Sequence, residues 1–322
     1  MNYRPFGKTG IALSEIGLGA WGVGGTQWKG GTDDEALGAL RLAFDLGINF
    51  VDTALAYGDG HSEKVVGRAV REHGRPVFLA TKIPPMNRVW PAQSGVSLAT
   101  VFPAEHIRKS TEISLRNLGV DTIDLQQAHV WNPDWTQQDE WRRSFEELKR
   151  SGKVRFIGAS LTEHDPDSGL DLIRTGLIDA VQVIYNIFDP SAAQSLFPLA
   201  KKMGVAVLAR VPLDEGGLTG AITETTTFPR DEFRAFYFKG DRPRQVVEHV
   251  NNLVADLKGV PGDLPEIALR FCLSGDAVTS VIPGMRRERH VRANIHASIL
   301  GPLPQDVLTR LAPHRWDRNF YT

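Results

Sequence analysis

The amino-acid sequence predicts a closed (β/α)8 barrel with a short N-terminal β-hairpin. Eight short apolar runs recur along its 322 residues, each too short for a free-standing helix and rich in Val, Ile and Phe. Such runs are typical of parallel strands covered on both faces. Helical patterns separate them, and a strand followed by a helix, repeated eight times, favours a closed barrel.

The composition predicts a single domain spanning residues 1–322. Hydrophobic content is 42% and charged content 23%, with no proline-rich linker or low-complexity block to mark a boundary. The formal net charge is −1, and Lys and Arg are scattered along the chain. A surface for nucleic acid or anionic lipid is therefore not expected. The composition leaves open whether the protein is a monomer or a homo-oligomer.

Targeting and cysteine signals favour a cytoplasmic protein. The first residues, MNYRPFGKTG, lack the apolar region of a signal peptide. No later stretch reaches the roughly 18 uninterrupted apolar residues of a membrane span. The one cysteine, Cys272, lies in the apolar run IALRFCL, which indicates a buried thiol in a reducing compartment.

The predicted strands follow the hairpin in a regular order. The segments YRPF and IALS form the hairpin around a turn at residues 7–10. The eight strands of the barrel lie in EIGLGAW, NFVDTA, VFLATK, IDLQQAH, VRFIGAS, AVQVIY, VAVLAR and TSVIPG.

Capping signals place the helices between the strands. Thr32 and Glu35 have the spacing of a capping box, and the helix that they begin stops at Gly47. Two later helices close at Gly119 and Gly152, where glycine permits the left-handed conformation of a C-terminal cap.

A glycine-rich stretch raises the alternative of a doubly wound dinucleotide-binding fold. The segment GLGAWGVGG, residues 17–25, superficially resembles the fingerprint of that fold. No helix of the right pattern follows it directly, and a lone glycine-rich stretch is a weak signal. The barrel remains the favoured architecture, and its site is expected at the C-terminal ends of the strands.

Four proton-handling residues fall at that end of the predicted barrel. Asp52, Lys82 and His129 end three successive strands, and Tyr57 follows in the turn after Asp52. Each also has a simple structural interpretation, as a turn cap, a rim aromatic, a solvated strand end or a core histidine. Independent structural roles give no reason for all four to gather on one rim, so an active site is favoured.

These residue types suit an acid that protonates a carbonyl oxygen. A neighbouring ammonium favours the phenolate of a tyrosine and lowers its pKa, and Lys82 is placed to do this for Tyr57. Asp52 would hold the lysine and keep it protonated. A neutral His129 would donate a hydrogen bond to a substrate oxygen that gains negative charge.

The motifs taken together resemble those of the aldo-keto reductases, especially the bacterial members. The resemblance covers nearly the whole chain. It is carried by FGKTGIALSEIGLGAWGVGG, GINFVDTALAYGDGHSEKVVGRAV, FLATK, RNLGVDTIDLQQAHVW, LKRSGKVRFIGAS and SVIPGMRRERHVRANI. It implies a catalytic tetrad of Asp52, Tyr57, Lys82 and His129, with Tyr57 protonating a carbonyl that receives hydride from a nicotinamide.

The resemblance also implies a nicotinamide cofactor, generally NADPH, with NADH as an alternative, bound without a Rossmann domain. The last strand-to-helix junction gives a physical basis for NADPH. Gly284 permits close approach of the backbone, Arg286 and Arg287 present guanidinium forks, and Asn294 lies on the following helix. The simpler interpretation is an ordinary basic helix start.

Other cofactor contacts follow from the same comparison. Ser160 and Gln182 are expected to hold the nicotinamide carboxamide, and the loop PLDEGGLTG after Arg210 to wrap the pyrophosphate. Alternatively, the glycines of that loop are simply turn residues. The expected cofactor-binding residues are Trp21, Asp52, Ser160, Gln182, Arg210, Pro212, Leu213, Gly216, Leu218, Gly284, Arg286, Arg287 and Asn294.

Two positions depart from the family pattern. Leu161 follows Ser160 where the family usually has asparagine, and Arg210 stands where many members stack a tyrosine on the nicotinamide ring. An arginine can stack on a flat ring. A cation near the forming nicotinamidium is unfavourable, however, unless Asp214 or Glu215 neutralises it.

Four tryptophans fall on or just beyond predicted strand ends: Trp21, Trp90, Trp131 and Trp135. An aromatic opening of this kind suits aldehydes and ketones with apolar substituents and does not exclude sugar-like substrates. Further aromatic residues in TTTFPRDEFRAFYFKGDR line this pocket, cover the cofactor or simply pack the loops onto the barrel. The expected substrate-binding residues are Trp21, Tyr57, Trp90, His129 and Trp131. We therefore expect an NADPH-dependent oxidoreductase that reduces aldehydes or ketones to alcohols.

Two rival functions keep the barrel. One is a catalytically slow, NADP(H)-binding redox-sensing or regulatory subunit, as the channel-associated members of the family are, and a turnover assay separates it from an enzyme. The other is a glycoside hydrolase, which needs a second carboxylate opposite Asp52, with Glu63 or Asp214 as candidates. The histidines lack a ligand spacing such as HExxH, so no metal is expected.

Overall fold

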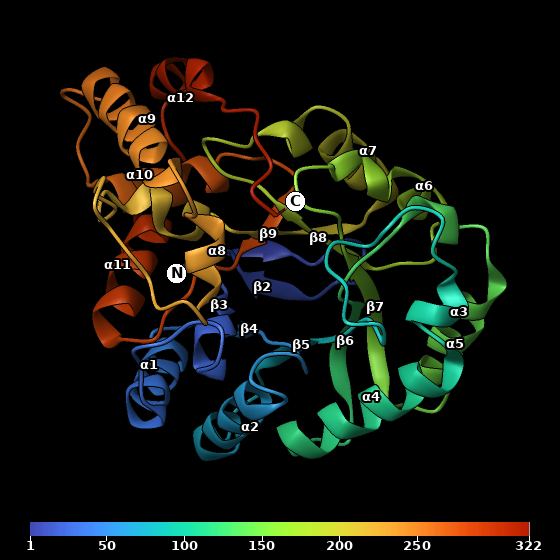
Figure 1. Ribbon diagram of the computed structural model, residues 1–322. Coiled ribbons are helices and arrows are strands. Elements are labelled where there is room, and N and C mark those ends of the chain that lie inside the picture. Colours follow the sequence, from blue (N-terminus) through green and yellow to red (C-terminus); the bar gives the residue numbers. More distant parts are fainter. Residues whose placement is uncertain (322) are drawn as a thin grey trace.

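Eight parallel strands form the centre of the protein, as the sequence predicts. The computed structural model describes residues 1–321 (Figure 1). The strands are β3 (Leu18–Gly19), β4 (Phe50–Asp52), β5 (Phe78–Ile83), β6 (Ile123–Ala128), β7 (Val154–Ser160), β8 (Ala180–Ile184), β9 (Ala206–Arg210) and β10 (Val278–Val281). They pair in chain order from β3 to β10.

Backbone bonds between the first and last strands close the sheet into a barrel. The amide of Gly17 donates to the carbonyl of Val281 at 2.8 Å, and the amide of Gly19 donates to the carbonyl of Pro283 at 3.0 Å. Isolated parallel bridges join the same two segments. The (β/α)8 barrel predicted from the alternating pattern is therefore confirmed.

Helices surround the barrel on its outside (Figure 1). They are α1 (Asp33–Asp45), α2 (His61–His73), α3 (Leu98–Val101), α4 (Ala104–Leu118), α5 (Asp139–Arg150), α6 (Leu170–Arg174), α7 (Leu196–Met203), α8 (Phe233–Tyr237), α9 (Arg242–Asp256), α10 (Leu264–Leu273), α11 (Glu288–Leu300) and α12 (Gln305–Leu311). Within residues 1–321, none of these helices has both the length and the apolar character needed to cross a bilayer.

The predicted capping signals act at the helix ends. The Thr32 hydroxyl accepts from the amide of Glu35 at 3.2 Å, and the Glu35 carboxylate accepts from the amide of Thr32 at 3.1 Å. Gly119 caps α4 with a φ of 68°. A side chain at this φ is strained, so glycine is the residue that ends the helix at low cost.

A short hairpin covers the N-terminal end of the barrel. Strands β1 (Tyr3–Pro5) and β2 (Ala12–Ser14) pair antiparallel. Phe6 in their turn is fully buried, and its ring packs 5.0 Å from Phe78 and 5.4 Å from Phe156. The barrel interior is therefore filled by apolar side chains at its N-terminal end. Polar side chains that could carry out chemistry are expected at the opposite, C-terminal end.

Candidate active site

A polar layer lies above the apolar side chains that fill the N-terminal end of the barrel. Asp52, Lys82, Gln127 and Gln182 come from β4, β5, β6 and β8, and each is at most 2% exposed. The register brings Lys82 opposite Gln127. Because side chains alternate along a strand, these four point into the barrel. They are shielded from water there, so their polar atoms must form hydrogen bonds with one another.

The Asp52 carboxylate is the centre of that layer. Its Oδ1 pairs with the Lys82 ammonium at 2.5 Å. Its Oδ2 accepts from the amide of Gln182 at 2.8 Å and from the amide of Gln127 at 3.2 Å. Charge-assisted bonds to both oxygens hold the carboxylate in one orientation.

Lys82 links this carboxylate to the phenol of Tyr57. Its Nζ also donates to the carbonyl of Thr53 at 2.8 Å and lies 3.3 Å from the Tyr57 hydroxyl. The rings of Tyr57 and His129 meet edge-on with centroids 5.7 Å apart. The structure thus brings together all four residues that the sequence places on one rim.

The surroundings of Tyr57 differ from the sequence expectation in one respect. Burial raises the pKa of the Tyr57 phenol, and Lys82 only partly opposes this rise. Desolvation outweighs the ammonium because the neutral phenol needs less solvation than the phenolate. The pKa therefore keeps Tyr57 protonated at neutral pH, which is the form that donates a proton.

The two neighbours of the phenol differ in charge, because Lys82 is cationic and His129 is neutral. Burial is the largest influence on Lys82 and opposes its charge, but attraction to and hydrogen bonds with Asp52 and Tyr57 together outweigh it and leave the pKa of Lys82 raised. Burial, followed by the charges of Lys82 and Arg210, lowers the pKa of His129 well below its usual value. The site therefore presents a fixed ammonium and a neutral imidazole, whose buried Nδ1 has no hydrogen-bond partner.

The predicted carboxamide pair lies beside this group. Ser160 and Gln182 are opposite each other in the register of β7 and β8. The Nε2 of Gln182 is engaged by Asp52. Leu161, which replaces the expected asparagine, is 1% exposed and packs into the core, so its side chain offers no polar contact.

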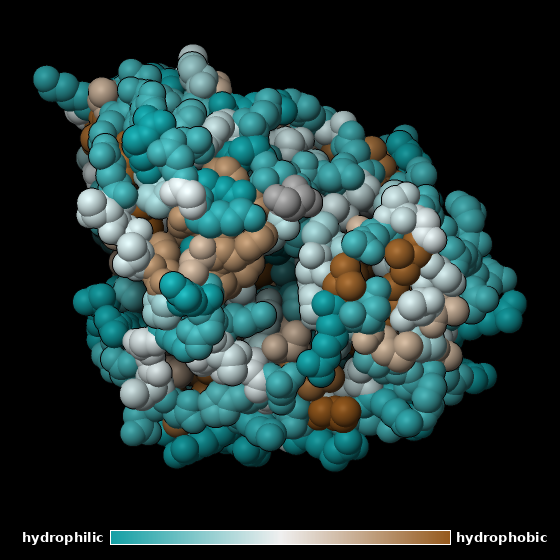
Figure 2. Space-filling view, in the orientation of Figure 1, coloured by the Kyte–Doolittle hydropathy of each residue, from teal (hydrophilic) through white to brown (hydrophobic). Residues whose placement is uncertain are grey.

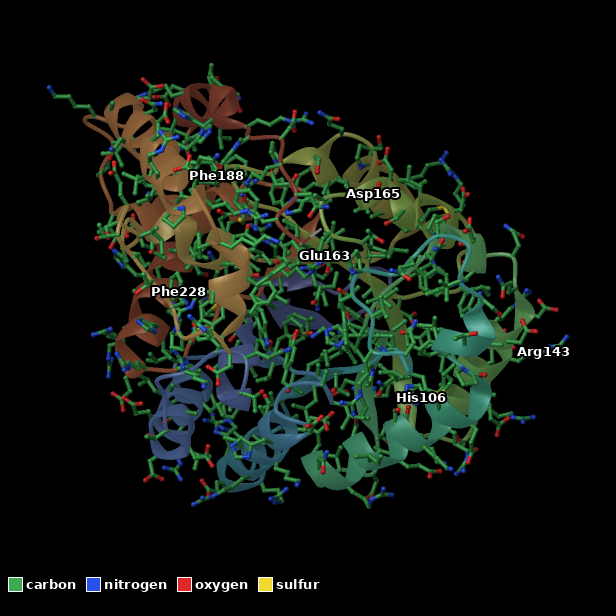
Figure 3. All side chains as sticks on the ribbon, in the orientation of Figure 1. His106, Arg143, Glu163, Asp165, Phe188 and Phe228 are labelled. Atoms are coloured by element: carbon green, nitrogen blue, oxygen red, sulfur yellow. The ribbon has the colours of Figure 1, made fainter. Side chains whose placement is uncertain are left out.

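Arg210 pairs with a carboxylate other than the two considered from the sequence. Its Nη2 donates to the carbonyl of Leu161 and pairs with Glu163 Oε1, both at 3.2 Å. Glu163 is labelled near the centre of the view in Figure 3. The acids considered from sequence are engaged elsewhere, since Asp214 pairs with Arg318 and Glu215 accepts from Tyr321.

The loop after β9 is tightly folded. It continues through Pro212 and Leu213 into a short 3-10 segment, Asp214–Thr219. The amides of Gly216 and Leu218 both donate to the carbonyl of Leu213, at 2.9 and 3.0 Å. Gly216 has a φ of +106° with open space where a side chain would project, while the Leu218 side chain is fully buried.

The predicted phosphate arginines contact the loop after β3. Arg286 donates to the carbonyls of Trp28 and Lys29, at 3.3 and 2.9 Å. Arg287 pairs with Glu35 at 3.3 Å. Burial and then the charges of Arg234 and Arg287 lower the pKa of Arg286, because positive charge accumulates here. Such a site favours an anion.

Aromatic residues surround the opening on the side of Trp21. Its ring centroid lies 4.9 Å from that of Phe233 and 6.1 Å from that of Tyr57. Trp90 is 40% exposed and stands edge-on to His129 at 5.8 Å. Figure 2 shows a hollow at the centre of this face with hydrophobic surface beside α8.

Trp131 lies in a different environment from Trp21 and Trp90. It is 1% exposed and packs edge-on against Trp135 and Trp141, 5.9 and 5.3 Å away. The structure therefore places this predicted substrate-binding residue in the hydrophobic core under α5.

The carboxylates considered for a hydrolase are engaged in protein contacts. Glu63 is fully buried and accepts from Thr81 at 2.6 Å and from Asn117 at 2.8 Å. Asp214, also fully buried, accepts from the Tyr237 hydroxyl at 2.9 Å. Neither is an acid free to act across a sugar bond from Asp52.

Comparison with known proteins decides the family. The model of the Aldo/keto reductase family matches residues 15–315. The chain is 34% identical over 300 residues to aldo-keto reductase YhdN of Bacillus subtilis, covering 91% of this chain and 87% of that protein. The chain belongs to the aldo/keto reductase family.

Two further relatives bear on the cofactor. The NADH-specific methylglyoxal reductase of Escherichia coli is 30% identical over 310 residues, covering 92% of this chain and 93% of that protein. The holo form of aldo-keto reductase AKR11C1 from Bacillus halodurans superposes with a TM-score of 0.77 at 26% identity, with full coverage of both chains. Aldo/keto reductases are oxidoreductases that use nicotinamide cofactors and act on small carbonyl compounds.

The residues of this aldo/keto reductase fit such a cofactor. Asn294 is 6% exposed, and its Nδ2 is buried without a hydrogen-bond partner. No atom lies within 4 Å of the position that a side chain at Gly284 would take. An unsatisfied amide within α11, and open space at Gly284 before that helix, are features that a polar, anionic ligand at the helix start would fit.

Sequence reasoning missed several residues that complete the site. Gln127 is a polar residue in the apolar run IDLQQAH and shares a strand face with His129, so period-two alternation could have identified it. Glu163 carries no such signal, because its pairing with Arg210 depends on the path of the loop after β7. The same holds for Arg318 and Tyr321 near the end of the chain.

Proposed function

We propose that this aldo/keto reductase reduces aldehydes or ketones to alcohols with NADPH, and that Tyr57 is the general acid. The observation that carries this proposal is the chain of contacts from Asp52 through Lys82 to the Tyr57 hydroxyl, 2.5 and 3.3 Å long. A phenol protonated at neutral pH beside a fixed ammonium is both a donor and a site where a phenolate is stabilised.

The residues divide the reaction between them. A bound reduced nicotinamide supplies hydride to the carbonyl carbon. Tyr57 gives its proton to the carbonyl oxygen, and the charge of Lys82 stabilises the phenolate that remains. Neutral His129 orients the carbonyl by donating to the same oxygen. Asp52 keeps Lys82 charged and in place.

The preference for NADPH rests on the cationic start of α11. Arg286, Arg287 and Arg289 lie within four positions of one another. Burial and the neighbouring positive charges lower the pKa of Arg286, so its charged form is disfavoured. A 2′-phosphate would relieve this repulsion and accept from the guanidinium forks. The remaining cofactor contacts predicted from sequence, at Ser160 and along residues 212–218, belong to the same proposal.

The substrate pocket that we propose contains Trp21, Tyr57, Trp90 and His129. Trp131 is left out because its ring is buried among other tryptophans. The exposed ring of Trp90 and the hydrophobic side of the hollow in Figure 2 suit carbonyl compounds with apolar substituents. The cytoplasmic location stays a prediction.

A screen of aldehydes and ketones tests this function directly. The purified protein is mixed with NADPH or NADH and each compound, and oxidation of the cofactor is followed by its absorbance. Turnover of a carbonyl compound at a rate typical of enzymes, about 1 s⁻¹ or more, is expected. Tight binding of the cofactor without turnover of any compound would instead favour the redox-sensing subunit.

A further inference from the structure

Arg210 reaches from the end of β9 across the end of β8 to the loop after β7. Its side chain is 14% exposed, and Nη2 is held by Leu161 and Glu163. The register puts Ile184 opposite Arg210 and Gln182 opposite Ser160. The guanidinium is therefore held one residue beyond Ser160. Ser160 pairs with Gln182, and these two residues are the ones proposed to hold the nicotinamide carboxamide.

Arg210 acts electrostatically on the reacting groups. The charge of Arg210 contributes to lowering the pKa of both Tyr57 and His129, whereas Glu163 is not among the main influences on either pKa. The Nε of Arg210 is buried and has no hydrogen-bond partner. At Tyr57 and His129 the charge of Arg210 is therefore felt more strongly than that of its partner Glu163.

Glu215, the other carboxylate among the main influences on the pKa of Arg210, cancels only part of this charge. Burial raises the pKa of Glu215 to about 7, so this side chain is only partly ionised at neutral pH. The Oε1 atom of Glu215 also accepts a hydrogen bond from the Tyr321 hydroxyl at 2.8 Å. Glu163 is therefore the carboxylate that limits the field of Arg210.

We propose that Arg210 makes the site select the oxidation state of its cofactor, favouring the neutral reduced nicotinamide over the cationic oxidised one, and that Glu163 limits this preference. The inference rests on the proposed function, since it takes the nicotinamide to lie beside Ser160 and Gln182. Two positive charges repel more strongly in a partly buried site than in water. The oxidised cofactor is consequently held less tightly and leaves more readily after reduction of the carbonyl.

Cofactor binding, measured without any carbonyl substrate, tests the inference. The Kd values for NADPH and NADP⁺, and for NADH and NAD⁺, are determined from the quenching of tryptophan fluorescence in the full-length protein. The wild type is expected to bind the oxidised form about tenfold more weakly than the reduced form. Arg210→Met is expected to bring this ratio of Kd values close to unity.

Two further variants separate charge from shape. Arg210→Lys keeps the cation and is expected to keep most of the ratio, while Glu163→Gln leaves the cation uncompensated and is expected to raise the ratio about threefold or more. A merely structural ion pair would change both Kd values equally and leave the ratio unaltered. If Arg210→Met does not fold by circular dichroism, Glu163→Gln alone decides.

The outcomes also separate this inference from the function on which it rests. Unchanged ratios in Arg210→Met and Glu163→Gln, with tight binding of both forms, would overturn the role of Arg210 and leave the reductase assignment intact. If the wild type binds none of the four dinucleotides, both the role of Arg210 and the reductase assignment would be overturned.

Discussion

Lys82 and Asp52 form an ion pair of 2.5 Å inside the barrel, and their side chains are only 1% and 3% exposed. Each charge depends on the other, because neither has water to solvate it. The pair also ends within 3.3 Å of the Tyr57 hydroxyl, so the residues that stabilise the polar layer also control the proposed acid.

Removing one member of this pair should reduce both stability and activity. Lys82→Met leaves a buried carboxylate uncompensated and is expected to lower the free energy of unfolding by about 3–5 kcal/mol. Its turnover should fall by about 10²-fold or more, since Tyr57 loses the neighbouring charge.

The double variant Lys82→Met/Asp52→Asn separates the two effects. It removes both charges, so denaturant unfolding should show most of the stability regained while turnover stays lost. A double variant no more stable than Lys82→Met would contradict the view that the unpaired carboxylate causes the loss.

Glu215 should make stability depend on pH. Burial raises its pKa from 4.5 to about 7, so the folded state holds the proton more tightly than the unfolded state. The resulting stabilisation is complete below pH 4.5 and is lost as the pH rises to about 7. The loss is roughly 3 kcal/mol for a shift of this size.

Comparison with Glu215→Gln isolates that contribution. The amide cannot ionise, so the variant should gain stability relative to the wild type between pH 5 and pH 8, by up to the same roughly 3 kcal/mol. Unfolding in denaturant at both pH values measures the difference. An equal difference between the two proteins at pH 5 and pH 8 would show that Glu215 does not titrate in this range.

Arg286 should discriminate between the two nicotinamide cofactors. Arg286→Ala is expected to weaken NADPH binding about ten- to a hundredfold, because charge-assisted bonds to a 2′-phosphate are lost, and to leave NADH binding nearly unchanged. Arg292→Ala, an exposed cation on the same helix, serves as the matched control. Equal weakening of both cofactors in Arg286→Ala would reject the phosphate role.

Two tryptophans predicted together from sequence should behave differently. Trp90→Ala removes an exposed ring beside His129 and should raise the KM for an aromatic aldehyde about tenfold without lowering stability. Trp131→Phe should leave that KM unchanged but lower stability by about 1–3 kcal/mol, because a buried ring loses its packing. Steady-state kinetics and thermal unfolding of both variants check this, and a larger KM change in Trp131→Phe would reverse the assignment.

Regular elements were predictable because each carries its own signal. The eight strands are short, apolar and buried on both faces, and the capping box at Thr32 marks a helix start wherever it occurs. The convergence of Asp52, Lys82 and His129 was predictable because parallel strands of a closed barrel end at one rim. These conclusions depend on the chain near each residue and on the symmetry of the barrel.

Contacts made by loops were not predictable in the same way. Trp131 lies two positions after His129, but the strand has ended there, so alternation no longer decides which way its ring points. The partner of Arg210 was sought among its sequence neighbours Asp214 and Glu215, whereas the pair forms with Glu163 on another loop. The direction of the pKa shift of Tyr57 also depends on burial, which a sequence does not give.

The central claim is that Tyr57 donates the proton to the carbonyl oxygen. Tyr57→Phe removes one hydroxyl and keeps the ring, so the Kd for NADPH should stay as in the parent while single-turnover oxidation of the cofactor by a good aldehyde slows about 10²- to 10⁴-fold. A variant that binds NADPH normally and reduces the aldehyde at the parent's rate would contradict this role.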